Sequence, residues 1–280
     1  MDWIRLWQEL VQATSNREKD DANQVERGAR NLSRRWAKPD STRDWIISQL
    51  DAVPDATVLD IGAGTGKWAI LLSRHVRTIT AIDSSPKMIQ LMRENLKAES
   101  IANVQVIPGT WPEIQVEPHD FSLCSHGMYG CADWRAFVER MVQATRRTCF
   151  LLMRAPTADG IMAQAATRIW GHPYDSPNFQ VAFNALLQMG IFPNVLMANT
   201  GLWDSWTSAS LENALDEIKR RFGIRHTNEY DAFLIDLLQR RLTLVEGQYV
   251  WTPDVRSALI YWNVGAQVFV PKEEKAIAQE

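Results

Sequence analysis

Apolar and polar positions alternate in a strand-then-helix order from about residue 43 to residue 153. The runs 58–61 and 78–83 are short and mostly apolar, as buried strands are. Between them, the apolar residues of 68–72 continue as a helix face. The run 149–153 is the expected fifth strand. This alternation predicts a parallel sheet with helices on both faces and right-handed connections.

Other patterns flank this core. Trp3, Leu6, Trp7 and Leu10 form one apolar stripe at helical spacing, so we expect helices in the first 40 residues. The cluster Asp40-Ser41-Thr42 is expected to cap the helix that leads into the first strand. The elements expected beyond residue 155 are helices at 158–170, 179–189, 208–222 and 229–241, strands at 192–197 and 257–264, and a frayed tail at 271–280.

Composition and charge restrict the size of the fold and the classes of partner that we expect. With 280 residues, 46% of them hydrophobic, the chain can bury a full core in one elaborated domain or one domain with a cap. No apolar run approaches eighteen residues and the first residues do not resemble a secretion signal, so we expect a soluble, cytoplasmic protein without a membrane partner. The net charge of −3 argues against bulk nucleic acid as the main substrate.

The turn after the first strand carries the strongest chemical signal. It reads Asp60-Ile61-Gly62-Ala63-Gly64-Thr65-Gly66, and its glycines let the backbone turn tightly and approach a ligand. Nucleotide folds of many kinds share such a turn. Asp60 distinguishes among them, because a carboxylate opposes a pyrophosphate seated on a helix N-terminus but attracts an ammonium or sulfonium. The turn therefore favours S-adenosylmethionine over NAD, FAD or ATP.

A second acid supports an adenosine site. The strand 78–83 ends at Asp83, which is well placed to accept hydrogen bonds from two ribose hydroxyls. Ser84-Ser85-Pro86 then supplies a cap and a first-turn proline for the next helix. NAD enzymes use the same second acid, so Asp83 indicates adenosine without choosing the cofactor.

These features resemble the class I S-adenosylmethionine-dependent methyltransferases, over about residues 43–155. Beyond the glycine turn and Asp83, the segment 103–112 is similar to the family's third strand and adenine loop. The segment 119–126 is similar to its fourth strand, whose end faces the sulfonium. One departure is the adenine loop, which reads Gly109-Thr110-Trp111 where members often carry an acid and a small residue.

The resemblance implies a fold and a domain organisation. The fold is α/β: a doubly wound, mostly parallel, seven-stranded Rossmann-like sheet with one antiparallel strand, plus a helical cap. The expected parts are a helical cap segment at 1–40, the cofactor-binding core at 41–155, the remaining strands with an inserted helical lid (156–190 and 205–242) at 156–270, and the tail at 271–280.

The resemblance also implies which residues bind the cofactor and which face the acceptor. Two side chains are candidates for proton transfer at the methyl end, His126 as the base and Tyr129 beside it. The alternative for His126 is that it only supports the cofactor's methionine end. The expected cofactor-binding residues are Asp60, Gly62, Ala63, Gly64, Gly66, Asp83, Ser84, Met88, Gly109, Thr110, Trp111 and Ser125, and no metal is expected.

The expected function is transfer of a methyl group from S-adenosylmethionine, by in-line displacement, to a small-molecule acceptor. The chain has 12 tryptophans, which either fill helix packing or line a pocket for an apolar or aromatic acceptor. Two alternatives stay open: a protein or tRNA methyltransferase, and a non-catalytic regulatory protein that binds S-adenosylmethionine. We expect a monomer or a homodimer.

The segments around the methyl end are expected to move. The charged stretch after residue 15 and the proline-broken loop 171–178, with His172 and Tyr174 as lid candidates, are expected to close over the cofactor. Deletion of residues 1–35 is expected to cost activity far more than folding, because the glycine turn lies outside that segment.

The glycine turn and Asp83 together generate a binding prediction. The purified protein should bind S-adenosylmethionine and S-adenosylhomocysteine in the micromolar range and NAD negligibly, as measured by calorimetric titration. Asp83→Ala should weaken binding by roughly 1.5–3 kcal/mol, the scale for lost hydrogen bonds to a charged group. Tight binding of NAD with none of S-adenosylmethionine would contradict the resemblance.

Overall fold

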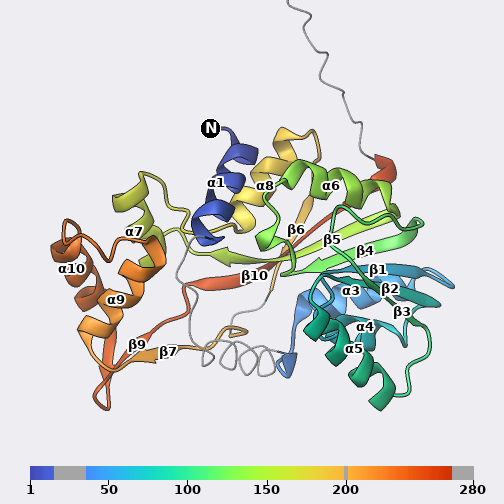
Figure 1. Cartoon of the computed structure of the whole chain (residues 1–280), viewed down its shortest axis with the longest axis horizontal. Helices are drawn as coiled ribbons and strands as arrows, with labels where there is room; N and C mark the ends of the chain where they lie inside the picture. Colours follow the sequence, from blue (N-terminus) through green and yellow to red (C-terminus); the bar gives the residue numbers. More distant parts are fainter. Residues whose placement is uncertain (16–35, 199–200, 267–280) are drawn as a thin grey trace, which may run out of the picture.

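The computed structural model describes residues 1–15, 36–198 and 201–266, and a seven-stranded sheet is its centre (Figure 1). The strand order is β3-β2-β1-β4-β5-β10-β6. All neighbours among the first five strands of that order pair in parallel, whereas β10 is antiparallel to both β5 and β6. The strands are β1 (Thr57–Ile61), β2 (Thr78–Asp83), β3 (Val104–Pro108), β4 (His119–Ser125), β5 (Thr145–Pro156), β6 (Asn194–Met197) and β10 (Val255–Asn263). The predicted sheet with one antiparallel strand is confirmed.

Helices cover both faces of this sheet (Figure 1). On one face lie α3 (Ser41–Asp51), α4 (Lys67–Leu72) and α5 (Pro86–Ala98), whose buried residues share one apolar cluster with the strands. On the other lie α6 (Trp134–Gln143), α8 (Phe179–Gln188) and the N-terminal α1 (Trp3–Ser15). Burial of apolar surface on both faces is what a parallel sheet requires.

Side-chain caps define where two of these helices begin. The carboxylate of Asp40 accepts hydrogen bonds from the backbone N–H groups of Thr42 and Arg43, so α3 starts at the cluster that the sequence indicates. Ser85 caps α5 in the same way, through the N–H of Met88, and Pro86 occupies its first turn. The Ser85 cap starts α5 directly after the carboxyl end of β2, whereas the Asp40 cap starts the helix that leads into β1.

Helix α1 belongs to the main core and does not form a lid. Its Trp7 is fully buried, and the indole N–H donates to the carbonyl oxygen of Cys131 at 2.8 Å. The ring also lies 4.2 Å, centroid to centroid, from that of Trp134 in α6. Because α1 packs in the core, deletion of residues 1–35 is expected to cost folding as well as activity. The charged stretch after residue 15, as far as residue 35, and the tail at 271–280 lie outside the described residues.

A second, smaller lobe follows the carboxyl end of β5. It contains α7 (Ile161–Trp170), α9 (Leu211–Phe222) and α10 (Asp231–Arg241), which share an apolar cluster of their own. A three-stranded antiparallel sheet, in the order β7-β9-β8, completes the lobe. Its strands are β7 (Trp206–Ser208), β8 (Thr243–Val245) and β9 (Gln248–Trp251). None of these three strands is among the elements expected from the sequence.

The loop 171–178 joins the lobe to α8 and is fixed in place. Asp175, Ser176 and Asn178 are each at most 3% exposed, and Asp175 forms a salt bridge with Arg221 of α9. The loop therefore packs against the second lobe as a wall, and its movement over the cofactor stays a prediction. None of the helices in the described ranges is both long and apolar enough to span a membrane.

The position of α1 generates a stability prediction. Trp7→Ala should destabilise the protein by about 3–5 kcal/mol, because it leaves a cavity and removes the hydrogen bond to Cys131. Urea unfolding measures this, with Gln8→Ala on the exposed side of the same helix as the control, where the change should stay within about 0.5 kcal/mol. Equal effects of the two substitutions would show that α1 adds little to the core.

Candidate active site

The glycine turn lies between the end of β1 and the start of α4. Gly62 and Gly66 have φ values of 69° and 81°, a region that side chains with a Cβ avoid. At Gly66 a Cβ would also come within 2.6 Å of the Met92 side chain, so this glycine is needed for α5 to pack. At Gly62 a Cβ would lie 3.1 Å from the Cα of Gly127, in the loop that follows β4. Gly62 belongs to the linings of two hollows, which therefore meet at this residue.

The first hollow lies beside Asp83 and has a volume of about 630 Å³. One carboxylate oxygen of Asp83 accepts from the N–H of Gly64 and the other from the N–H of Ser85, both at 2.8 Å. A carboxylate has about four lone-pair positions, so two hydrogen bonds leave capacity for ribose hydroxyls. Of the expected cofactor residues, Gly62, Asp83, Ser84, Gly109, Thr110 and Trp111 line this hollow.

Trp111 contributes less to this hollow than the sequence suggests. Its side chain is only 8% exposed, and its indole N–H donates to the carbonyl oxygen of Phe137 at 3.2 Å. The ring therefore belongs mainly to the core beneath the hollow. Sequence analysis missed the opposite wall, where the loop after β4 and the start of α6 contribute Cys131 and Asp133.

Asp60 lies in the second hollow, and its carboxyl group is buried without a full set of partners. The residue is 1% exposed, and its Oδ2 has no hydrogen-bond partner. Burial, and secondarily the negative charge of Asp83, raises the pKa of Asp60 from 3.8 to about 7, although the backbone of Ala69 opposes the shift. A cation placed here would supply what the carboxylate lacks.

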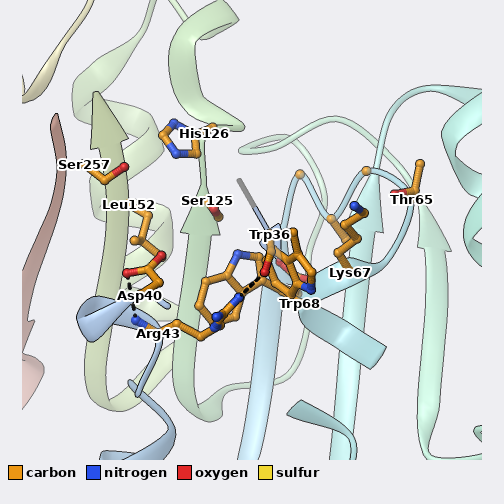
Figure 2. A pocket seen from close by; sticks show the side chains of 14 residues that line it. Trp36, Asp40, Arg43, Thr65, Lys67, Trp68, Ser125, His126, Leu152 and Ser257 are labelled. Carbon is orange, nitrogen blue, oxygen red and sulfur yellow. Dashed lines mark hydrogen bonds between the residues drawn. The ribbon is translucent and has the colours of Figure 1, made fainter. Parts of the chain in front are cut away.

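The second hollow, which Figure 2 draws, has a volume of about 160 Å³ and shares Gly62 with the first. The glycine turn forms one wall through Asp60, Gly62, Ala63, Gly64 and Thr65. The remaining lining residues come from five other parts of the chain: Trp36, Asp40 and Arg43 before and within α3, Lys67 and Trp68 of α4, Ser125 and His126 at the end of β4, Leu152 in β5 and Ser257 in β10.

Aromatic and cationic side chains make up one wall of this second hollow (Figure 2). The rings of Trp36 and Trp68 meet edge to face at 5.4 Å. The guanidinium of Arg43 lies 5.3 Å from the Trp36 ring centroid and donates to the carbonyl oxygens of Trp36 and Lys38. Lys67 Nζ lies 5.9 Å from the same ring. Arg43 therefore holds the segment before α3 in place, and the Trp36 ring of that segment contacts Trp68 at the start of α4.

His126 reaches this hollow and Tyr129 supports it from behind. His126 has a left-handed backbone, with φ of 58°, which is uncommon outside glycine and concentrates at functional sites. Its Nδ1 is 3.0 Å from the hydroxyl oxygen of Tyr129. Tyr129 itself lines neither hollow. The expected pair is thus brought together, with only the imidazole facing the space.

Two expected cofactor residues lie outside both hollows, namely Gly66 and Met88. Conversely, Trp36, Arg43 and Trp68 were not expected in the site. The number of tryptophans was the only sequence signal for two of them, since nothing in the pattern shows that the segment before α3 returns to the glycine turn. In the described ranges, no group of His, Cys, Asp or Glu side chains could hold a metal ion.

Comparisons with known proteins agree with this geometry. Residues 58–148 match a family model described as a methyltransferase domain. A release factor glutamine methyltransferase of Vibrio cholerae is 39% identical over 78 residues, which are 26% of this chain and 27% of that protein. The chain spans only 14–28% of the length of three such curated relatives.

Residues 58–148 form a methyltransferase domain. S-adenosylmethionine is the cofactor of that domain, as expected from the glycine turn. The similarity to an uncharacterised Haemophilus influenzae protein is broader, with 24% identity over 81% of this chain and 83% of that one. The YcgJ protein of Bacillus subtilis shares the fold, with a TM-score of 0.50 and 17% identity over 79% of this chain and 97% of its own.

The buried carboxyl of the methyltransferase domain generates a pH prediction. Because the pKa of Asp60 is raised in the folded state, the proton it holds stabilises the fold fully below about pH 4, and this contribution is lost as the pH rises through 7. The free energy of unfolding of Asp60→Asn, relative to the natural protein, should therefore rise by roughly 4 kcal/mol between pH 4 and pH 8. Urea unfolding at each pH measures this, and a difference that stays constant with pH would contradict it.

Proposed function

We propose that the protein transfers the methyl group of S-adenosylmethionine to a small-molecule acceptor that is apolar or aromatic on the face it presents to the site. The single observation that carries this proposal is the second hollow. This hollow is lined by the Asp60 carboxyl, whose Oδ2 has no hydrogen-bond partner, by the His126 imidazole and by the rings of Trp36 and Trp68.

The residues around Gly62 fit the cofactor. The Asp60 carboxylate matches the ammonium group of the methionine end, and Asp83 retains acceptor capacity for the ribose. The two hollows meet at Gly62, so a ligand with an adenosine end and an amino-acid end can use both. When bound, S-adenosylmethionine supplies an activated methyl group, and the protein's task is then alignment and exclusion of water, worth roughly 7–11 kcal/mol.

The lining of the second hollow supports a small acceptor. Its volume of about 160 Å³ suits a single ring system or a short chain. Trp36, Trp68 and Leu152 provide apolar faces, and aromatic faces also attract planar rings and cations. The net charge of −3 gives no basic footprint for RNA.

His126 is the side chain that we propose for proton transfer. It lines the hollow, and the Tyr129 hydroxyl lies 3.0 Å from its Nδ1, so one ring nitrogen is held while the imidazole borders the space for an acceptor. A hydroxyl, amine or thiol acceptor must lose a proton, and a positioned base typically contributes about 10²–10⁴-fold. The residue therefore removes the acceptor proton in this proposal, while Trp36 and Trp68 hold the acceptor.

A screen of small phenols, amines and thiols tests this function, with formation of S-adenosylhomocysteine as the readout. For the best acceptor, His126→Ala should lower kcat by about 10²–10⁴-fold and leave binding of S-adenosylhomocysteine unchanged. Trp36→Ala should raise the acceptor KM by about 10–100-fold, the size of a lost aromatic face. His172→Ala, which lines neither hollow, is the matched control.

Three outcomes would redirect the proposal. Methyl label that enters protein or tRNA from a cell extract, with no small acceptor found, would favour the macromolecular alternative. Binding of S-adenosylhomocysteine without turnover of any acceptor would favour a regulatory protein. Full activity of His126→Ala would leave a methyltransferase that works by alignment alone.

A further inference from the structure

A continuous series of polar contacts leads from His126 into the second lobe. The hydroxyl oxygen of Tyr129 is 3.0 Å from His126 Nδ1 and accepts a hydrogen bond of 2.7 Å from the backbone N–H of Arg154, near the end of β5. The Arg154 guanidinium lies 5.0 Å from the centroid of the Tyr129 ring. The phenol is thus held at its oxygen and on its ring face by the same residue.

Arg154 is in turn held by the loop 171–178. Its Nη2 donates to the Ser176 hydroxyl at 3.0 Å and lies 3.4 Å from the Pro177 carbonyl oxygen. The Ser176 hydroxyl donates to a carboxylate oxygen of Asp175 at 3.2 Å. Arg221 Nε donates to the other carboxylate oxygen of Asp175 at 2.6 Å. The series therefore ends at Arg221 of α9, a helix of the second lobe.

Two of the residues that make these contacts are buried, so the loss of a contact carries an energetic cost. Asp175 and Ser176 are 3% and 1% exposed, so an unpaired charge or hydroxyl there would be costly. A buried ion pair need not add net stability, but removing one partner leaves the other unsatisfied. Such pairs can select one arrangement among several. The arrangement that these contacts hold is that of Arg154 and Tyr129 next to His126.

The chemistry of a phenol explains what the series does for the imidazole. A tyrosine hydroxyl has one hydrogen and two lone pairs, and the Arg154 N–H uses one lone pair. The oxygen is consequently anchored to the backbone of β5. For the imidazole to take a proton at Nε2, Nδ1 must carry the other ring hydrogen and donate it to the second lone pair of the Tyr129 oxygen, and this arrangement holds the ring orientation and that tautomer of His126. His126 needs this support, because its left-handed backbone is not self-stabilising.

We propose that Tyr129 and Arg154 are positioning residues for His126, and that the Asp175–Arg221 pair makes this positioning depend on the docking of the second lobe. The proposal rests on the proposed function, in which the imidazole takes the acceptor proton. Tyr129 then acts through His126 and not on the acceptor, which changes the role expected from the sequence.

Imidazole NMR on the intact protein tests the positioning without any acceptor. The chain has 5 histidines, so selective ¹⁵N labelling gives few signals, and His126→Gln assigns the relevant pair. In the complex with S-adenosylhomocysteine, Tyr129→Phe should change the ¹⁵N shifts of His126 from those of one tautomer to an average. Asp175→Asn should produce a change in the same direction, with S-adenosylhomocysteine affinity within threefold of the natural protein.

Two further variants keep the test decisive. Arg221→Lys retains the charge but loses the planar fork, so it replaces Asp175→Asn if that variant does not fold. Asp216→Asn breaks another ion pair of α9, with Arg225, outside the series and should leave the His126 signals unchanged. Unchanged His126 signals in Tyr129→Phe would overturn the proposal. A change in Tyr129→Phe but in neither Asp175→Asn nor Arg221→Lys would overturn its dependence on the lobe.

Kinetics with the best acceptor separate this proposal from the proposed function. Tyr129→Phe should lower kcat about tenfold, the size of one lost hydrogen bond, with the KM for S-adenosylmethionine unchanged. Full activity of His126→Ala would remove the proposed base while the NMR result still reports on positioning. Loss of activity in His126→Ala with full activity in Tyr129→Phe would keep the base and overturn the positioning role.

Discussion

A carboxyl group buried at the end of β1 is the constraint on which the site depends. Asp60 is 1% exposed and its Oδ2 has no partner, so the ionised form is costly and the pKa rises to about 7. A folded protein tolerates such a cost where a ligand offsets it. The glycine turn directly after Asp60 leaves room for that ligand, and the ammonium group of S-adenosylmethionine has the charge that the carboxylate lacks.

Elements from several parts of the chain surround the Asp60 carboxyl. The loop after β4 approaches the glycine turn closely where Gly127 lies next to Gly62. Gly62 lines both the hollow beside Asp83 and the hollow beside Asp60. The Asp60 side is completed by elements far apart in the sequence. Arg43 clamps the segment before α3 over it, and Lys38 ties that segment to Gly201 and Asp204. The acceptor space is therefore a product of the assembly as a whole, in contrast to the cofactor turn, which is local.

That contrast explains what the sequence could and could not predict. Strands β1 to β5, the caps at Asp40 and Ser85, and the glycine turn depend on neighbours a few residues away, so their patterns were readable. The strands β7 to β9 have three or four residues each and carry no periodicity. The sequence does not distinguish Trp7 from Trp36, yet Trp7 is buried in the core and Trp36 lines the second hollow. Trp111 lines the hollow beside Asp83 as expected, but the sequence could not show that its indole N–H donates to the Phe137 carbonyl oxygen, because that is a tertiary contact.

The most direct measurement is the number of protons released when S-adenosylmethionine binds. Calorimetry in two buffers of different ionisation enthalpy gives that number at each pH. If the cofactor's cation completes Asp60, binding should release nearly one proton at pH 6 and about half a proton at pH 7, and Asp60→Asn should bind more weakly and release none. Binding without proton release at pH 6, or equal release by Asp60→Asn, would contradict the account.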